Sequence, residues 1–151
     1  MWAVLWVQRL YVRLRLFEPP PGVGERLVTV VRRTMAEQRG PRVELLWFQD
    51  CPNHQAARAM LGDLLSELAP GTTVEDVDAS DSAVAEQNRF PGSPTIRIDG
   101  RDVDPSFRDP GDYTPRCRLY YTAEGLRGVP ERAWVVSALR ASLERRGHAV
   151  R

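Results

Sequence analysis

Short apolar runs alternate with helical periodicity from residue 43 onward, and this alternation restricts the chain to an α/β arrangement. VELLWF at 43–48 is an apolar run suited to a buried strand. Apolar residues then recur every three or four positions up to Leu68, which predicts an amphipathic helix that Pro70-Gly71 ends. The segment 72–78 predicts a second strand, parallel to the first because a helix separates the two.

The second half of the chain predicts four more elements. In chain order they are a helix at 80–90, a strand at 95–98, a strand at 116–122 and a helix at 131–146. Ser80 or Asp81 fits the cap of the first helix, and Pro130 fits the start of the last. The loop at 101–115 is rich in Asp and Pro and predicts a solvated connection. The expected order is β-α-β-α-β-β-α in one domain, with a mixed sheet and helices on both faces.

The ends of the chain fall outside this pattern. Residues 1–40 form an N-terminal extension, which is either disordered or an over-extended reading of the gene. The α/β domain is expected over 41–147, and 148–151 form a tail. Residues 1–42 carry eight Arg against three Glu, whereas residues 43–151 carry thirteen Arg against seventeen acids. The domain therefore lacks the basic footprint of a nucleic-acid-binding protein.

The composition of the chain limits the cellular compartment and the kinds of reaction that we expect. No apolar run approaches the length of a membrane span, and the first residues lack the features of a signal peptide, so a cytoplasmic protein with reduced thiols is expected. The chain has two cysteines and 21 basic residues, all of them Arg. The absence of Lys excludes mechanisms that need a Schiff-base or phosphate-binding lysine.

Cys51 is the first candidate for chemistry. It ends the first predicted strand and starts the first predicted helix, and Pro52 suits the first helical turn. A thiolate at a helix start faces free backbone N–H groups and the positive end of the helix dipole, as a nucleophilic or metal-binding thiol requires. The alternative is that Cys51 is a small buried residue of the core.

The turn Gly92-Ser93-Pro94-Thr95 precedes the third predicted strand, and Pro94 is a candidate for a cis peptide bond. Together with Cys51-Pro52-Asn53-His54, this turn resembles the thioredoxin superfamily, in which a Cys-x-x-Cys begins the first core helix and faces a cis-proline loop. The resemblance covers roughly 100 residues by the predicted order of elements. The chain also resembles small bacterial thioredoxin-like proteins with one Cys-Pro, a GSPT-type loop and a late Cys-Arg-Leu-Tyr, here Cys117 to Tyr120. Some of those proteins carry the label alkylmercury lyase.

The resemblance implies a thioredoxin-like three-layer fold and monothiol chemistry, because His54 stands where dithiol members have their second cysteine. Cys51 would attack a disulfide or form a mixed disulfide with a low-molecular-weight or protein thiol. His54, on the same helix face, would tune the sulfur. Pro52, Ser93, Pro94 and Thr95 would contact the substrate, with the Ser93-Pro94 turn pairing to it like a strand. The alternatives are organomercurial or soft-metal chemistry, and a binding module that has lost the chemistry.

Cys117 is a possible second thiol. If the strand at 95–98 pairs antiparallel with residues 117–121, Cys117 lies about 13 Å from the cis-proline end of the site. That is too far for a disulfide, whose Cα atoms lie within about 7 Å, so a direct bond to Cys51 is not expected in the resting fold.

No resident metal or organic cofactor is expected. Cys51, His54, Cys117 and His148 are four possible zinc ligands, but only the first pair has ligand spacing. The acidic residues between 99 and 112 lack the spacing of an EF-hand.

Overall fold

The structure, a computed structural model, describes residues 40–148; the predicted extension, except for its last residue, and residues 149–151 lie outside it. The elements are β1 (Val43–Trp47), α3 (His54–Leu68), β2 (Val74–Asp78), α4 (Ser82–Gln87), β3 (Thr95–Ile98), β4 (Arg101–Asp102), β5 (Tyr120–Thr122), β6 (Gly125–Arg127) and α5 (Arg132–His148). None of the helices in residues 40–148 combines the length and apolar character that crossing a bilayer requires.

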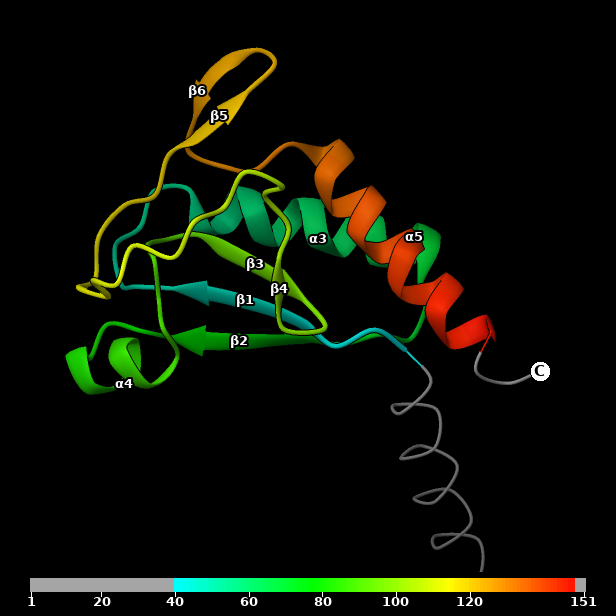
Figure 1. The fold of residues 1–151 in the computed structure, drawn as a ribbon, viewed down its shortest axis with the longest axis horizontal. Coiled ribbons are helices and arrows are strands. Elements are labelled where there is room, and N and C mark those ends of the chain that lie inside the picture. Colours follow the sequence, from blue (N-terminus) through cyan, green and yellow to red (C-terminus); the bar gives the residue numbers. More distant parts are fainter. Residues whose placement is uncertain (1–39, 149–151) are drawn as a thin grey trace, which may run out of the picture. The chain divides into compact units, whose positions relative to one another are not determined.

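Four strands form the central sheet in the order β2-β1-β3-β4 (Figure 1). β1 runs parallel to β2, from Val43 opposite Val74 to Trp47 opposite Asp78. β3 runs antiparallel to β1 and to β4. The sheet is therefore mixed, as expected, and the apolar run of β1 lies in its interior with its first four residues buried.

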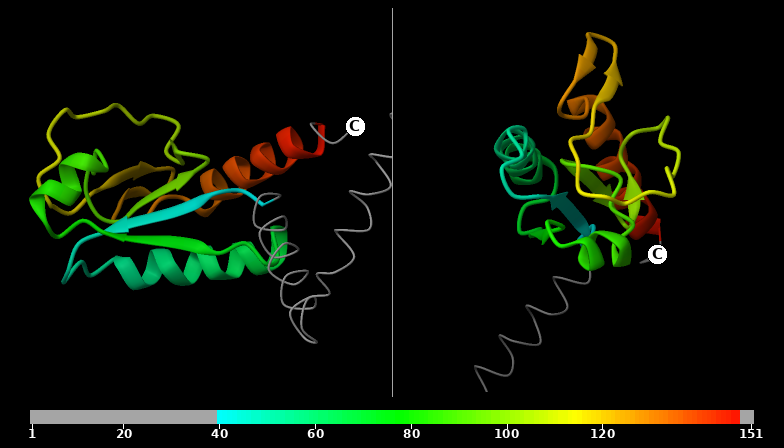
Figure 2. Two further views of the ribbon diagram at one scale, coloured as in Figure 1. Left: turned by 90° about the horizontal axis from the view of Figure 1, so that it is seen from below. Right: turned by 90° about the vertical axis from the view of Figure 1, so that its left-hand side faces the viewer.

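Helices cover both faces of this sheet (Figures 1 and 2), also as expected. Side chains of a strand alternate between faces, so Val43 and Leu45 pack with α3 and α5. Leu46 points to the other face, where it packs with Ala85 of α4 and with Phe90. The two clusters form the core on either side of β1.

The helix at 80–90 is confirmed in a shorter form, as α4. Asp81 is its N-cap, because the carboxylate accepts hydrogen bonds from the amides of Ala83 (2.8 Å) and Val84 (3.1 Å). Ser80 has a different part: its hydroxyl donates to Asp78 and accepts from the amide of Gln49 (2.8 Å). Of the two expected caps, the structure uses Asp81.

The prediction for the fourth strand of the sheet was wrong. That strand is β4, within the stretch expected to be a solvated loop, and β5 pairs with β6 in a separate hairpin. β4 follows directly from the turn Asp99-Gly100, whose φ angles of 52° and 75° are both positive. Asp-Gly is a strong signal for a two-residue hairpin of this kind, and it brings the chain straight back along β3.

Asp99 ties this hairpin to the two ends of the domain. Its carboxylate accepts hydrogen bonds from the Arg42 amide (3.1 Å), the Ser142 hydroxyl (2.6 Å) and the guanidinium groups of Arg145 (3.1 Å) and Arg146 (2.7 Å). The start of β1 and the end of α5 therefore meet at one carboxylate, which is a structural anchor and not part of a solvated loop.

Replacing Asp99 by asparagine tests this anchor. Asparagine has the same size and tolerates the left-handed backbone of the turn. We expect the free energy of unfolding at pH 7, measured by urea denaturation, to fall by about 1–3 kcal/mol, since charge-assisted hydrogen bonds are lost. Asp63→Asn, on the exposed side of α3, is the control and should unfold like the wild type.

The same pair of proteins should differ less at acid pH. Burial alone would raise the pKa of Asp99, but hydrogen bonds from Ser142, Arg146, the Arg42 amide and Arg145 together hold it below its ordinary value. A carboxyl whose pKa is lowered by folding stabilises the protein above its unfolded pKa, and that stability is lost as the pH falls below about 4. A difference that persists unchanged at pH 2 would contradict this.

Candidate functional site

Cys51 lies in a turn between β1 and α3. Its amide donates to the Phe48 carbonyl (3.2 Å), and its own carbonyl accepts from the His54 amide (3.3 Å). α3 begins at His54 with Asn53 as the N-cap residue, so Cys51 and Pro52 precede the helix. The expectation that Cys51 starts the helix was therefore wrong by three residues. Pro52 is exposed, whereas Cys51 keeps only 8% of its surface accessible.

The imidazole of His54 packs against β1 and β2. It stacks on the ring of Trp47, with centroids 4.2 Å apart and the planes 4° from parallel. Its Nε2 lies 3.9 Å from a carboxylate oxygen of Asp76, which also pairs with Arg58. Burial, helped by the charge of Arg58, lowers the pKa of His54 and favours the neutral ring. Within residues 40–148 no hydrogen bond joins His54 to the Cys51 thiol.

The Ser93-Pro94 peptide bond is cis, as the resemblance implies. Ser93 and Thr95 are fully buried, and Pro94 is among the most buried side chains. The Thr95 hydroxyl donates to the Gly92 carbonyl (2.7 Å), which closes the turn on itself. The Ser93 hydroxyl oxygen is buried and has no hydrogen-bond partner.

The backbone of Ser93 pairs with a distant segment of the chain, residues 116–118. The Ser93 amide donates to the Arg116 carbonyl (2.8 Å), and the Arg118 amide donates to the Ser93 carbonyl (2.8 Å). Cys117 is thereby the bridge partner of Ser93, in parallel orientation. The expectation that Ser93 offers free backbone groups to an extended substrate is corrected, since both groups are already bonded within the chain.

This pairing corrects the expected position of Cys117. The antiparallel pairing of β3 with 117–121 does not form, because β4 occupies that side of β3. Cys117 lies directly beside the cis-proline turn and is exposed. Both cysteines are free thiols in this structure.

Gly92 permits the close approach of the 116–118 segment. Its φ of 135° is disfavoured for residues with a side chain, and a Cβ there would lie 3.1 Å from the Arg116 carbonyl oxygen and from Cβ of Arg118. Any larger residue at position 92 would push this segment away from Ser93.

A buried ion pair that was not predicted from the sequence fixes the same segment. Arg118 is 8% exposed and binds Asp102 through both terminal nitrogens (2.6 and 3.1 Å), Asp104 (3.3 Å) and the Thr95 hydroxyl (3.1 Å). Burial opposes its charge, but hydrogen bonding to Asp102 and the nearby acids raise the pKa of Arg118 above its usual value.

Aromatic rings complete the surroundings of Arg118. Its guanidinium lies 4.5 Å from the centroid of the Tyr120 ring and 5.0 Å from that of Phe107. The Tyr120 hydroxyl donates to the Pro94 carbonyl (2.6 Å), so the same network holds the cis-proline turn from the other side.

The sequence contained a signal for this network. In RCRLYY, positions 118 and 120 are buried and positions 117, 119 and 121 are exposed, which is the period-two alternation of a strand. An Arg on the inner face of such a strand needs a buried carboxylate, and the Asp-rich stretch just upstream supplies two of them.

Several of the expected site residues gather at one end of the sheet. The carboxyl end of β1, the turn with Cys51 and the start of β3 lie there in Figure 1, since Leu46 pairs with Thr95. Gly128, just after β6, closes over the turn: a Cβ at Gly128 would collide with the side chain of Asn53. Cys117 pairs with Ser93, the residue before Pro94 and Thr95, whereas the ring of His54 is directed to Trp47 and Asp76.

Neither a family model nor a curated protein matches this chain.

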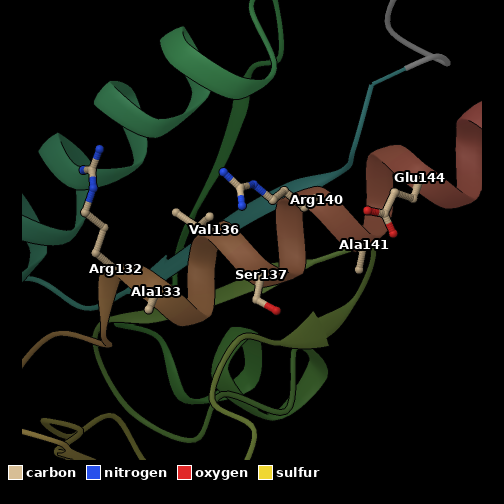
Figure 3. Close-up of a pocket in the computed structure, with 7 residues that line it drawn as sticks. All are labelled: Arg132, Ala133, Val136, Ser137, Arg140, Ala141 and Glu144. Atoms are coloured by element: carbon tan, nitrogen blue, oxygen red, sulfur yellow. The ribbon is translucent and has the colours of Figure 1, made fainter.

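Two further features lie apart from these residues. An open hollow of about 740 Å³ runs along α5 between Arg132 and Glu144 and contains none of the expected site residues (Figure 3). In the part of the chain that the structure describes, no group of three or more His, Cys, Asp or Glu side chains is arranged to hold a metal ion.

Replacing Arg118 by methionine tests the ion pair. The variant leaves the buried carboxylates of Asp102 and Asp104 without their cation, so we expect the free energy of unfolding to fall by about 3–5 kcal/mol in urea denaturation. Arg116→Met is the matched control, because Arg116 pairs with Asp112 at the surface and its loss should change stability little. Equal losses in the two variants would show that burial of the pair does not matter.

Replacing His54 by phenylalanine tests whether the ring acts by packing. His54→Ala should lose about 0.5–1.5 kcal/mol of stability with the stack on Trp47, and His54→Phe should recover most of it. Because folding lowers the pKa of His54, the wild type should lose stability relative to His54→Phe as the pH falls through about 6.5. If both variants slow the reaction of Cys51 equally at pH 7, the imidazole has a chemical role instead.

Proposed function

We propose that this protein is a thioredoxin-like protein that uses Cys51 for thiol–disulfide exchange, forming a mixed disulfide with a low-molecular-weight thiol or a protein thiol. The observation that carries the proposal is the meeting of two elements at one end of the sheet. The Cys-Pro turn follows β1, and the cis Ser93-Pro94 turn precedes β3, which is paired with β1 in register Leu46 opposite Thr95.

The topology supports the same proposal. The sheet order β2-β1-β3-β4, with β3 antiparallel to its neighbours and helices on both faces, agrees with the fold that the resemblance implies.

The chemistry needs only the sulfur of Cys51 and a disulfide. The Cys51 thiolate attacks one sulfur of the disulfide, a Cys51 mixed disulfide forms, and the other sulfur leaves as a thiolate that takes up a proton. The contacts of His54 do not support a part for it in this step, because its ring is held by Trp47 beside Asp76.

The β5–β6 hairpin favours a protein as the partner. Leu119, Tyr121 and Leu126 are exposed to 55%, 83% and 48%, and Tyr121 and Leu126 are cross-strand partners. These side chains give a protein substrate an apolar surface two residues from Cys117.

The proposal predicts that folding makes Cys51 reactive. In Cys117→Ser protein, Cys51 is the only thiol, and its mixed disulfide with oxidised glutathione can be followed by intact mass at pH 7. We expect the folded protein to react about tenfold faster than the same protein in urea, since the folded site must activate the thiol. Cys51→Ser, Cys117→Ser protein controls for non-specific adducts.

A thiol that reacts only after unfolding would overturn the proposal. Cys51 would then be a packing residue, and the domain would be a binding module on the same fold.

A further inference from the structure

Cys117 is held in place by the backbone on both sides of it. Ser93 bonds to the residue before Cys117 and to the residue after it, at 2.8 Å in each case. Arg118 anchors the segment from within through Asp102, and Gly92 makes room for it. The backbone of Cys117 is therefore fixed, while its side chain is exposed.

Cys51 lies in the turn after β1, the strand that pairs with β3. β1 pairs with β3 up to Leu46 opposite Thr95, and the chain then turns back so that the Cys51 amide meets the Phe48 carbonyl. Ser93 lies two residues before Thr95. Cys117 is therefore paired with Ser93, and Cys51 follows the end of β1 that pairs with Thr95, although the two cysteines are 66 residues apart in the sequence.

Ser93 contributes a second, independent sign of a reactive site. Its side chain is fully buried, and its hydroxyl oxygen has no hydrogen-bond partner. Buried hydroxyl groups are nearly always paired, so the unpaired hydroxyl of Ser93, the bridge partner of Cys117, is a donor available to a thiolate or to an incoming sulfur.

From these observations we infer that Cys117 is the second thiol of the site, which resolves a mixed disulfide on Cys51 by closing an intramolecular Cys51–Cys117 disulfide. The inference rests on the proposed function of Cys51 and adds a partner to it. Cys117 would supply the thiol that His54 replaces within the Cys51-x-x-His54 motif.

The reaction balances with a disulfide as the oxidant. Cys51 first takes one half of the disulfide and releases the other half as a thiol. The Cys117 thiolate then attacks Sγ of Cys51, the Cys51–Cys117 bond forms, and the second half leaves as a thiolate that takes up a proton. Two protein thiols lose two electrons in total, and one substrate disulfide becomes two thiols.

Closure requires the two Cα atoms to come within about 7 Å. Residues 116–118 are held by Ser93 and Arg118, whereas residues 48–53, which carry Cys51, belong to no helix or strand, so this turn can shift toward Cys117 without breaking the central sheet.

Oxidised glutathione is the probe for this inference. The full chain, Cys117→Ser and Cys51→Ser proteins are each treated with it, quenched with acid, and examined by intact mass and by non-reducing peptide mapping. We expect the wild type to lose both thiols, retain no glutathione and yield a Cys51–Cys117 peptide. Cys117→Ser should retain glutathione on Cys51.

The outcomes separate the two proposals. If Cys117→Ser retains glutathione on Cys51 and the wild type does too, the resolving role of Cys117 is wrong and the proposed function stands. Disulfide-linked dimers in place of an internal bond would also overturn the inference. If Cys51 takes up no glutathione in the folded Cys117→Ser protein, both proposals fail.

Gly92→Ala tests whether the pairing with Ser93 positions Cys117. It should slow closure of the internal disulfide by about tenfold or more while Cys51 still takes up glutathione, because the 116–118 segment is displaced. Gly111→Ala is the matched control: it also has a positive φ, 66°, but a Cβ there meets nothing within 4 Å. Closure at the wild-type rate in folded Gly92→Ala would contradict the positioning, and the wild-type result stands as a test even if that variant does not fold.

Discussion

The buried pair of Arg118 and Asp102 is the interaction on which the candidate site depends. Arg118 comes from the connection that leads to β5, and Asp102 ends β4. The same guanidinium reaches Thr95 at the start of β3 and lies over the ring of Tyr120. These contacts compensate for burying the charge of Arg118, because an unpaired guanidinium in the interior would lower the stability of the fold by several kcal/mol. One residue thus fixes the position of a long irregular connection against the cis-proline turn.

In this arrangement, the side chains that hold the segments in place are different from the two thiols that are proposed to react. The side chains of Arg118, Asp102, Thr95 and Tyr120 are bonded to each other or to the turn. The two cysteines are free thiols, with Cys51 buried and Cys117 exposed. A rigid support suits a reaction in which a thiol must approach a second sulfur closely. In the proposed reaction, the pairing of Ser93 with residues 116–118 therefore positions Cys117 in addition to stabilising the fold.

Local patterns predicted the regular part of the fold well. β1, α3, β2, α4, β3 and α5 all lie where periodicity and caps indicated, and the cis bond at Pro94 follows the resemblance. The errors concern residues whose roles are decided at a distance. Asp99, Asp102 and Asp104 looked like a solvated acidic loop, yet they hold α5 and Arg118. His54 looked like a partner of Cys51 one helical turn away, but the helix starts at His54 itself and the ring packs on Trp47.

The sequence by itself determined the α/β class, the order of the first five elements and the two motifs with Cys51 and Pro94, because these depend on periodicity and on residues close together in the chain. Only the tertiary structure decided that β4 and not the segment at 116–122 completes the sheet, and that Cys117 pairs with Ser93. Both pairings depend on which backbone groups and charges, distant in the sequence, come into contact once the core has formed. A buried Arg and its carboxylates select that pairing through desolvation, and desolvation is a property of the folded chain and not of any local stretch of it.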